Sequence, residues 1–535
     1  MIGTWVSIIP PILAIVMVLL TRRVLLSLGT GIVAGALIVA AFSPTQIFIE
    51  LWESITVSFW DWGSSAINSD NINIMLFILL LGVITAFVSL SGGSRAFAEW
   101  AIRHVKTKRG AKLLTVALGI AIFVDDYFNS LAVGQISRPI TDRHKISRAK
   151  LAYFIDSTSA PICVVSPISS WGAYLIGLLG IMFSGAAAIS YSPLSAFLLM
   201  APMNFYVVTT LALVFFFAWT NVDFFEMKRH EDRAESKGQL YDPNKEIPGQ
   251  LKEDFPVHAY GKVRDLVAPI VTLIVVTLLM MVWTGYQASV ADGIAVSIWS
   301  IFENTNVPYS LVIGGLSGAG LAAILYSLQF KNNETANTLL MRQAFTSGVK
   351  AMMPAVLILI LAWGLTDLID KLDTGVYLSN VVMQANIPVA FLPAIMFVLA
   401  GLMAFSTGTS WGSFGILLPI AGKIMLDASP EMLLPALAAV LAGAVFGDHC
   451  SPISDTTILS STGAGCNHMD HVATQLPYAL MSAGITVIGY VVLGVTGSIW
   501  LGLLSVIVVL IVLFSVWTMR SKAGKVALGH SKQSI

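Results

Sequence analysis

The stretch that decides the fold is residues 447–457, GDHCSPISDTT, which follow directly on the apolar segment 433–446. This stretch places two carboxylates, an imidazole, four hydroxyls and a proline where a membrane helix would be apolar. A proline removes a backbone donor and leaves a carbonyl without its helical partner. The pattern therefore predicts a helix that is broken inside the membrane around a polar site.

A second copy of this design lies earlier in the chain. Residues 166–169 repeat the SPIS sequence of 451–454, again after an apolar run and downstream of an intramembrane aspartate. Each copy is also preceded by a short polar break, at 125–130 (DDYFNS) and at 406–411 (STGTSW). Paired breaks in the two halves of a membrane protein indicate a transport site.

Composition places the chain in the membrane. Of its 535 residues, 56% are hydrophobic and 11% are charged, whereas a soluble domain has roughly 25% charged residues. A formal net charge of zero gives no basic surface for nucleic acid. Its three cysteines have no zinc-type spacing. The sequence also lacks a nucleotide loop, an HExxH motif and a nucleophile elbow, so we do not expect an enzyme.

The basic residues set the orientation of the spans. Two basic clusters, within 95–112 and 138–150, should both face the cytoplasm, yet an apolar stretch and the break at 125–130 separate them. A segment that leaves and returns to one side is a re-entrant hairpin. Irregular backbone at membrane depth requires surrounding protein or a water-filled cavity, so the tip should point inward.

We therefore expect an all-α polytopic membrane protein, with two inverted repeats that contain re-entrant helical hairpins and broken transmembrane helices, plus one extra C-terminal helix. The predicted parts are the first repeat 1–220 (hairpin about 111–139, broken helix about 151–182), a cytoplasmic linker 221–262, the second repeat 263–494 (hairpin about 388–425, broken helix about 433–466), and the extra helix with a cytoplasmic tail, 495–535. Because the second repeat begins on the opposite side from the first, the two repeats are inverted.

The predicted ion and proton site consists of Asp156, Asp448 and Asp455. A charged side chain at the bilayer centre costs roughly 2.5–3.5 kcal/mol on insertion scales, and such residues are functional by default. We expect Na⁺ at these three carboxylates. Asp125 and Asp126 would assist from the first hairpin tip, unless the pair lies in an aqueous loop.

His449 is the remaining candidate for proton chemistry, because histidine titrates near neutral pH. A structural hydrogen bond is the equal alternative for it. His468 and His471 are expected at the surface. Trp171 and Trp411 would either line a substrate pocket or pack.

Hydroxyl and amide oxygens near the predicted breaks are candidate ion ligands or substrate contacts, because hard cations take several oxygen ligands. The alternative is that they cap or back-bond to helix ends. These residues are Asn129, Ser130, Ser157, Thr158, Ser166, Ser169, Thr407, Thr409, Ser410, Ser451, Ser454, Thr456 and Thr457.

Residues 447–457, together with 123–131 (FVDDYFNSL), resemble the NhaC-type sodium/proton antiporter family of the wider ion transporter superfamily. The resemblance runs from about residue 71 to residue 483. It implies secondary active transport with inverted repeats, hairpins and broken helices. Some members of that family exchange sodium or protons for organic acids, and others resembling it have been proposed as amino-acid transporters.

The functional expectation is exchange of Na⁺ for H⁺ across the cell's inner (plasma) membrane by an elevator or rocking alternating-access mechanism. The alternative is Na⁺- or H⁺-coupled transport of a small organic acid or amino acid. The expected partners are Na⁺, H⁺ and the lipid bilayer, with an organic solute in the alternative. No nucleic acid is expected, and no cofactor beyond Na⁺ as transported or coupling ion. The oligomeric state stays open, with a homodimer among the options.

Overall fold

The computed structural model describes the chain except residues 1, 22, 64, 124–125, 168, 185–190, 246, 248–260, 332–336, 375, 378–379, 382–387 and 534–535. The described part is almost entirely helical, and its strands are the short antiparallel pair β1 (Trp60–Asp61) and β2 (Ala66–Ile67). Eight of its helices are long and apolar enough to cross a membrane, or up to nine if one bent pair is a single span. The protein is therefore an all-α polytopic membrane protein.

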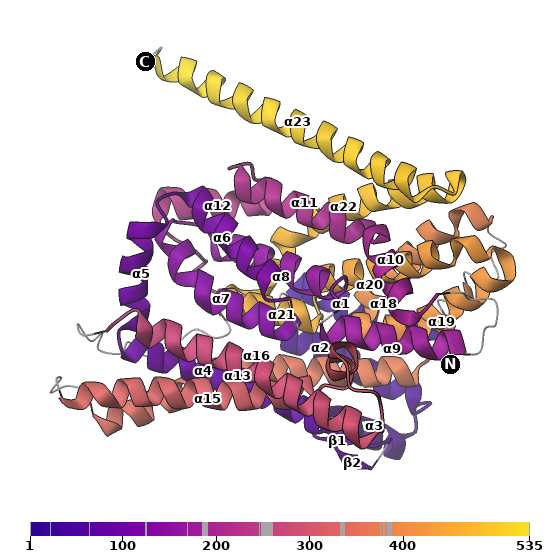
Figure 1. Ribbon diagram of the computed structural model, residues 1–535, viewed down its shortest axis with the longest axis horizontal. Coiled ribbons are helices and arrows are strands. Elements are labelled where there is room, and N and C mark those ends of the chain that lie inside the picture. The colour runs from indigo at the N-terminus through magenta and orange to yellow at the C-terminus, as the bar shows by residue number, and fades with distance from the viewer. Residues whose placement is uncertain are drawn as a thin grey trace.

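The helices form two bundles (Figure 1). The framework bundle consists of α1 (Ile9–Thr21), α2 (Val24–Val39), α3 (Pro44–Thr56), α4 (Ser69–Leu90), α5 (Gly93–His104), α13 (Arg264–Ala291), α14 (Ile298–Glu303), α15 (Val307–Ser327) and α16 (Thr338–Lys371). The hairpin bundle consists of α6 (Lys108–Ala121), α7 (Asp126–Arg143), α8 (Arg148–Cys163), α9 (Ser170–Ser184), α10 (Pro193–Met200), α11 (Phe205–Trp219), α12 (Phe225–Lys237), α18 (Leu392–Thr407), α19 (Ser410–Ala428), α20 (Leu433–Cys450), α21 (Asp455–Ala464), α22 (His468–Thr496) and α23 (Ile499–Gln533).

Each bundle has its own hydrophobic core. Buried apolar side chains fall into two clusters, one built mainly from the hairpin bundle and one mainly from the framework bundle. In Figure 1 the framework helices α4, α13 and α15 lie across the lower part and the hairpin bundle lies above them. Helices α7 and α21 pack on α8, but Leu131 of α7 and Leu459 of α21 belong to the framework core. These two helices therefore form the boundary between the bundles.

The tips of the hairpins are closed by short polar side chains. Asn129 donates its side-chain N–H groups to the carbonyls of Gly119 and Ile122, at 2.6 and 2.7 Å, and so caps the end of α6. At the other tip α18 ends at Gly408, whose φ of +73° is left-handed, and Thr409 caps the start of α19. Both helix pairs lie in the regions where hairpins are predicted. The inverted relation of the two repeats stays a prediction.

The SPIS repeat has the same local role in both copies. The last serine of each copy caps the helix that follows the break: Ser169 Oγ accepts the backbone N–H of Gly172 at 2.9 Å, and Ser454 Oγ accepts that of Thr457 at 3.3 Å. Such caps satisfy a donor that a helix start otherwise leaves free. The repeat therefore ends one helix and begins the next at a fixed spacing.

The first two long helices of the chain are short for membrane spans. Helices α1 and α2 have 13 and 16 residues, whereas a span needs roughly 20. The described part of the predicted linker 221–262 contains a helix, α12, which packs against α8 and α22.

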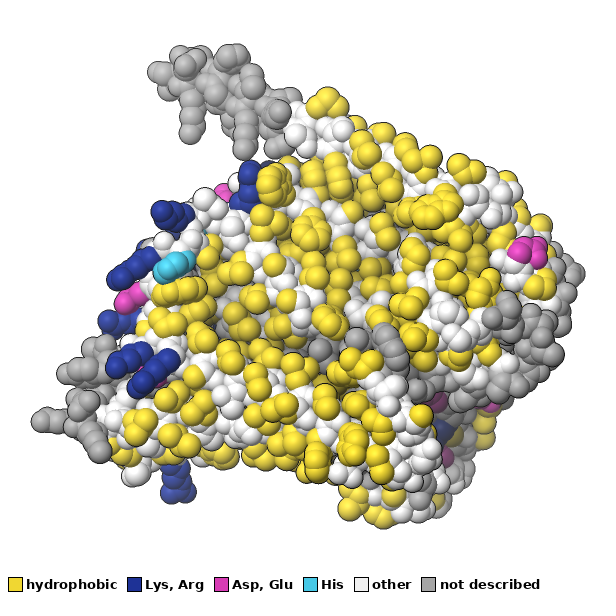
Figure 2. Space-filling view, in the orientation of Figure 1, with side chains coloured by type: hydrophobic (Ala, Val, Ile, Leu, Met, Phe, Trp, Pro, Cys, Tyr) yellow, Lys and Arg dark blue, Asp and Glu magenta, His cyan; other side chains and the backbone are white. Residues whose placement is uncertain are grey.

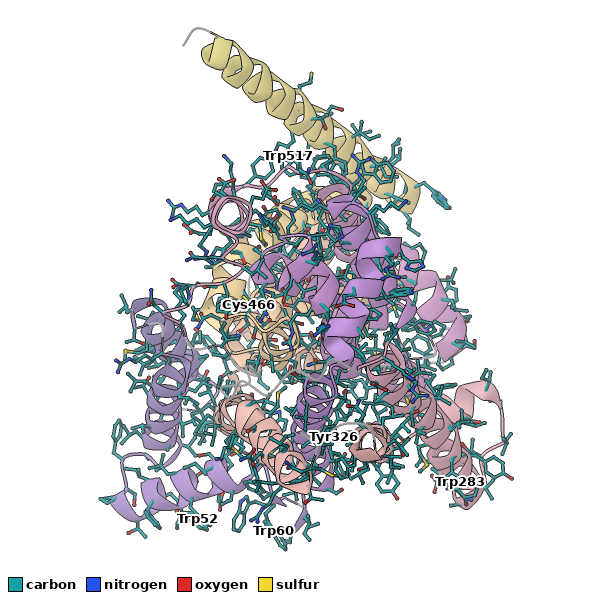
Figure 3. All side chains as sticks on the ribbon, turned by 90° about the vertical axis from the view of Figure 1, so that its left-hand side faces the viewer. Trp52, Trp60, Trp283, Tyr326, Cys466 and Trp517 are labelled. Carbon is teal, nitrogen blue, oxygen red and sulfur yellow. The ribbon has the colours of Figure 1, made fainter. Side chains whose placement is uncertain are left out.

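The surface distinguishes the two ends of the helices. Figure 2 shows Lys and Arg gathered at the left-hand edge, which we call the basic end, next to a broad hydrophobic surface. Figure 3 looks onto this end: Trp52 and Trp283 lie on the outer rim, whereas Cys466 and Tyr326 lie inside. The two tryptophans are 58% and 57% exposed. Exposed aromatic and apolar side chains around the rim are typical of a lipid-facing surface.

Candidate functional site

The short helix α21 lies at the centre of a buried polar site. All ten of its residues are buried. Its first residue is Asp455, its N-cap Ser454 contacts Asp448, and Ser460 contacts Asp156. One helix of the second broken segment thus connects the three carboxylates that the sequence singled out.

Asp448 joins the second hairpin to the second break. Its Oδ2 accepts the backbone N–H of Ser410 at 3.2 Å and the hydroxyl of the same residue at 2.7 Å. Its Oδ1 accepts the Ser454 hydroxyl at 2.5 Å and lies 3.5 Å from the Thr456 hydroxyl. Thr457 donates to the Asp448 carbonyl at 3.4 Å. The carboxylate therefore lies at the starts of two helices, where the backbone dipoles favour negative charge.

Asp156 binds groups from the other side of α21. Its Oδ2 accepts Gln475 Nε2 at 2.5 Å and lies 3.0 Å from His471 Nε2. Its Oδ1 lies 3.2 Å from the Ser460 hydroxyl, which lies 3.1 Å from that of Ser130. Because Ser130 is on α7, this chain of contacts reaches the first hairpin.

Asp455 completes the set of predicted acids. Its Oδ1 accepts the backbone N–H of Thr456 at 2.8 Å, and its Oδ2 accepts the hydroxyl of Tyr127 on α7. Asp126, the first residue of α7, is buried. Asp125 lies outside the described residues.

His449 is held by two hydroxyl groups. Its Nε2 lies 3.0 Å from Ser157 Oγ and its Nδ1 lies 2.8 Å from Tyr206 Oη. A neutral imidazole has one donor and one acceptor, and hydroxyls satisfy both. This geometry fits the structural alternative for His449.

Several predicted oxygen ligands bond to backbone carbonyls. Thr158 donates to Phe154 O at 2.7 Å, which is ordinary back-bonding within a helix. Similar bonds to carbonyls hold Ser166, Ser169, Thr407 and Ser451 at helix ends. Thr409 caps α19. In this conformation these side chains bond to helix backbone, whereas Ser410, Ser454, Thr456 and Ser130 face the carboxylates or their bound hydroxyls.

The expectation that His468 and His471 lie at the surface is wrong. Both are buried, since α22 begins beneath the break that follows α20. His468 Nε2 lies 2.8 Å from the carbonyl of Pro452, and Gln475 donates to the carbonyl of His449. Side chains of α22 thus satisfy the carbonyls that the break releases. The spacing of His468, His471 and Gln475 on one helix face could have indicated this role.

Among the described residues, the candidate cation ligands surround the individual carboxylates and do not form one common cluster of acids. Within the described ranges, no three His, Cys, Asp or Glu side chains are placed to hold one metal ion together. Around Asp448 the available groups are instead hydroxyl oxygens, which suit a hard cation such as Na⁺. A Na⁺ site shared by Asp156, Asp448 and Asp455 stays a prediction.

Aromatic rings flank the second hairpin tip. Trp411 follows Ser410 directly, and its ring centroid lies 5.4 Å from that of Trp171 and 4.9 Å from that of Tyr174. Trp171 is buried, and within the described residues no group accepts a hydrogen bond from its Nε1. The packing alternative accounts for the ring contacts.

A many-helix membrane fold with breaks around buried carboxylates defines the class of secondary transporters. The family model described as the Na⁺/H⁺ antiporter family matches residues 162–495, which is more than half of the chain. The chain therefore belongs to the Na⁺/H⁺ antiporter family, and it is a transporter.

Three relatives extend this assignment. An uncharacterized protein of Haemophilus influenzae is 48% identical over 95% of this chain and 94% of its own length. An uncharacterized Na⁺/H⁺ antiporter of the same organism is 34% identical over 27% of this chain and 31% of its own length. A malate-2H⁺/Na⁺-lactate antiporter of Bacillus subtilis is 34% identical over 20% of this chain and 22% of its own length.

Proposed function

We propose that the protein exchanges Na⁺ for H⁺ across the plasma membrane, with Asp448 as the central acid of the site. The observation that carries this proposal is the position of its carboxylate between Ser410 of the second hairpin and Ser454 of the second break. A buried carboxylate requires either a proton or a cation to offset its charge. Alternate neutralisation by H⁺ and by Na⁺ is the minimal chemistry of an antiporter.

The surrounding hydroxyls suit both occupants. A serine or threonine hydroxyl can donate to the ionised carboxylate and still offer lone pairs to a cation. Ser410, Ser454 and Thr456 supply three such oxygens near Asp448. Asp156 and Asp455 would add charge from either side of α21, with Asp126 contributing from the first hairpin.

An elevator movement is the conformational step that the architecture favours. Both hairpins and both broken helices belong to the hairpin bundle, which has its own core. Polar contacts across the apolar boundary include those of Thr85, which donates to Gln135 at 3.0 Å, and of Thr366, which donates to the carbonyl of Thr407 at 3.1 Å. We infer that the hairpin bundle carries the site as one body past the framework bundle.

The test is proton movement in proteoliposomes that contain the purified protein, on addition of sodium, lithium or potassium without organic solute. Asp448→Asn should abolish sodium-driven proton movement, because the site then cannot carry the charge. Asp232→Asn, at an exposed position on α12, should behave as the unaltered protein. Full exchange by Asp448→Asn would contradict the assignment.

The second candidate function is coupled transport of a small organic acid or amino acid. The cluster of Trp171, Tyr174 and Trp411 beside Ser410 favours it, as does similarity to a relative named a malate/lactate antiporter. In this case sodium alone would move no protons, and labelled lactate, malate or amino acids would be taken up or released in the same vesicles.

A further inference from the structure

A basic pocket lies at the basic end, away from the carboxylate site. It has a volume of about 690 Å³ and is lined by Arg103, Val105, Lys106, Arg143, His144 and Lys145. The pocket connects the end of α5 with the end of α7, and His144 Nε2 lies 2.9 Å from the carbonyl of Val105. One wall thus comes from the framework bundle and the other from the hairpin bundle.

The cations of this pocket lack acidic partners among the described residues. Across the parts of the chain that the structure describes, Arg103, Lys106, Arg143 and Lys145 form no ion pair. Asp142, in the last turn of α7, is bound by Arg148 at 2.9 Å. Four uncompensated cations around one cavity favour an anionic ligand.

Aromatic residues near the pocket indicate the depth of lipid headgroups. Trp100 of α5 is 40% exposed and stacks on His104, with ring centroids 4.4 Å apart. Trp219, at the end of α11, is 58% exposed and lies under the guanidinium of Arg109 at 4.8 Å. Tryptophans with adjacent Lys and Arg mark a membrane–water interface, and an excess of basic residues marks its cytoplasmic side. Figure 2 shows the basic side chains at the margin of the hydrophobic surface.

We propose that this pocket binds the phosphate of an anionic phospholipid headgroup from the cytoplasmic leaflet. Arginine matches phosphate geometry with paired N–H groups, and lysine adds compact charge. A lipid is the source at hand, because its phosphate lies at this depth and its acyl chains can cover the adjoining apolar surface. The bound headgroup would connect α5 to α7 and so act on the boundary between the two bundles.

The test is native mass spectrometry of the full-length protein, titrated with phosphatidylglycerol, with phosphatidylcholine and with soluble glycerol 3-phosphate. We expect phosphatidylglycerol to bind most tightly. The paired variant Arg103→Gln with Arg143→Gln should lose affinity by about fivefold for each neutralised side chain. The matched control is Lys228→Gln with Arg229→Gln, two exposed cations on α12, which should bind as the unaltered protein does.

A charge-preserving variant, Arg103→Lys with Arg143→Lys, should retain most of the affinity. Equal phosphatidylglycerol binding by the glutamine variant and the unaltered protein would overturn the site. Binding of glycerol 3-phosphate as tight as that of phosphatidylglycerol would overturn the lipid as the source of the phosphate. Equal binding of phosphatidylcholine would overturn the role of net lipid charge.

Discussion

Neighbouring residues in the second break have different surroundings. Asp448 contacts Ser410 and Ser454, whereas His449 contacts Ser157 and Tyr206. Successive residues of a helix point about 100° apart, so one faces the hairpin tip and the other faces α8 and α11. The residue types could be read from the sequence, but which of the two faces the site depends on tertiary packing.

The hydroxyl of Ser410 tests the Asp448 site most directly. Ser410→Ala removes a donor to the carboxylate but keeps the backbone N–H that also binds it. A hydrogen bond to a charged group is worth about 1.5–3 kcal/mol, so the sodium concentration for half-maximal exchange should rise at least about tenfold. Sodium-driven proton movement in proteoliposomes measures this change.

The control for this prediction is Ser406→Ala. Ser406 lies on the same hairpin but donates to the Leu402 carbonyl, at 2.7 Å. Its substitution should leave the sodium dependence unaltered. Similar changes in both variants would show that the tip acts through its shape and not through the bond to Asp448.

At the scale of helices, the sequence predicted the features that depend on neighbouring residues. It did not predict the contacts between segments that are far apart in the chain. The two SPIS copies predicted both breaks, because a proline and a capping serine act within one turn. The sequence did not predict Tyr127 as a partner of Asp455, or Gln475 as a partner of Asp156. In each pair the two residues are more than 300 positions apart in the chain and meet only through the packing of α7 and α22 at the site. Thr158 was an expected ligand, but its hydroxyl could equally bond to the backbone of its own helix, and the structure shows this bond.

The crossing of α7 and α21 depends on two glycines. A Cβ on Gly134 would lie 2.4 Å from the backbone of Gly463, and one on Gly463 would lie 2.3 Å from the carbonyl oxygen of Ser130. Gly134→Ala should therefore separate the two helices and destabilise the protein by about 1–3 kcal/mol, with loss of transport. Thermal unfolding in detergent and the proteoliposome assay measure both effects.

Gly484→Ala is the matched substitution, because a Cβ there meets nothing within 4 Å. It lies on α22 of the same bundle and should leave stability and transport unchanged or slightly improved, since alanine favours a helix. A Gly134→Ala protein with normal stability would contradict the close crossing of α7 and α21.

At the scale of the whole molecule, the division in sequence differs from the division in space. Both predicted repeats contribute helices to both bundles. A boundary at 221–262 therefore separates the predicted repeats but does not separate the framework bundle from the hairpin bundle. Amphipathic periodicity identifies buried faces without identifying which core they enter. The two cores therefore could not be predicted from one sequence.

The linker helix α12 is fastened to the hairpin bundle by buried ion pairs. Lys150 binds Asp223 at 2.6 Å, and Glu231 binds Lys108 at 2.7 Å and lies 3.9 Å from Lys150. Burial alone would raise the pKa of Glu231, but Lys150 and Lys108 outweigh burial and hold that pKa below its ordinary value of 4.5. Glu231 therefore adds stability at neutral pH, and this contribution is lost as the pH falls through the lowered pKa.

Lys150→Met should remove this stabilisation. Breaking a buried pair by removing one partner costs about 3–5 kcal/mol, because a charge remains without compensation. The pKa of Glu231 should also rise, so acid unfolding should begin at a higher pH than in the unaltered protein. Thermal unfolding between pH 4 and pH 7 measures both changes. Lys228→Met, on the exposed face of α12, should alter neither of them.

An elevator movement predicts that a fixed link across the bundle boundary stops transport. Thr85 on α4 and Gln135 on α7 are in contact at 3.0 Å across that boundary, so cysteines at both positions should be joined by mercuric ion or by a short bifunctional methanethiosulfonate reagent. The three native cysteines are buried, and they would first be replaced. Transport should fall to background on linking, because the hairpin bundle can no longer move against the framework bundle, and it should return when excess thiol removes the link.

A cysteine pair within one bundle is the control that distinguishes blocked movement from an effect of the chemical modification itself. Thr284 and Thr305 both belong to the framework side, with their hydroxyls 3.1 Å apart. The same reagents should join cysteines at these positions without loss of transport, since no relative movement is needed between them. Continued exchange by the Thr85–Gln135 linked protein would instead confine the movement to the hairpins and breaks themselves, where α21 and the tip at Ser410 could open and close around Asp448.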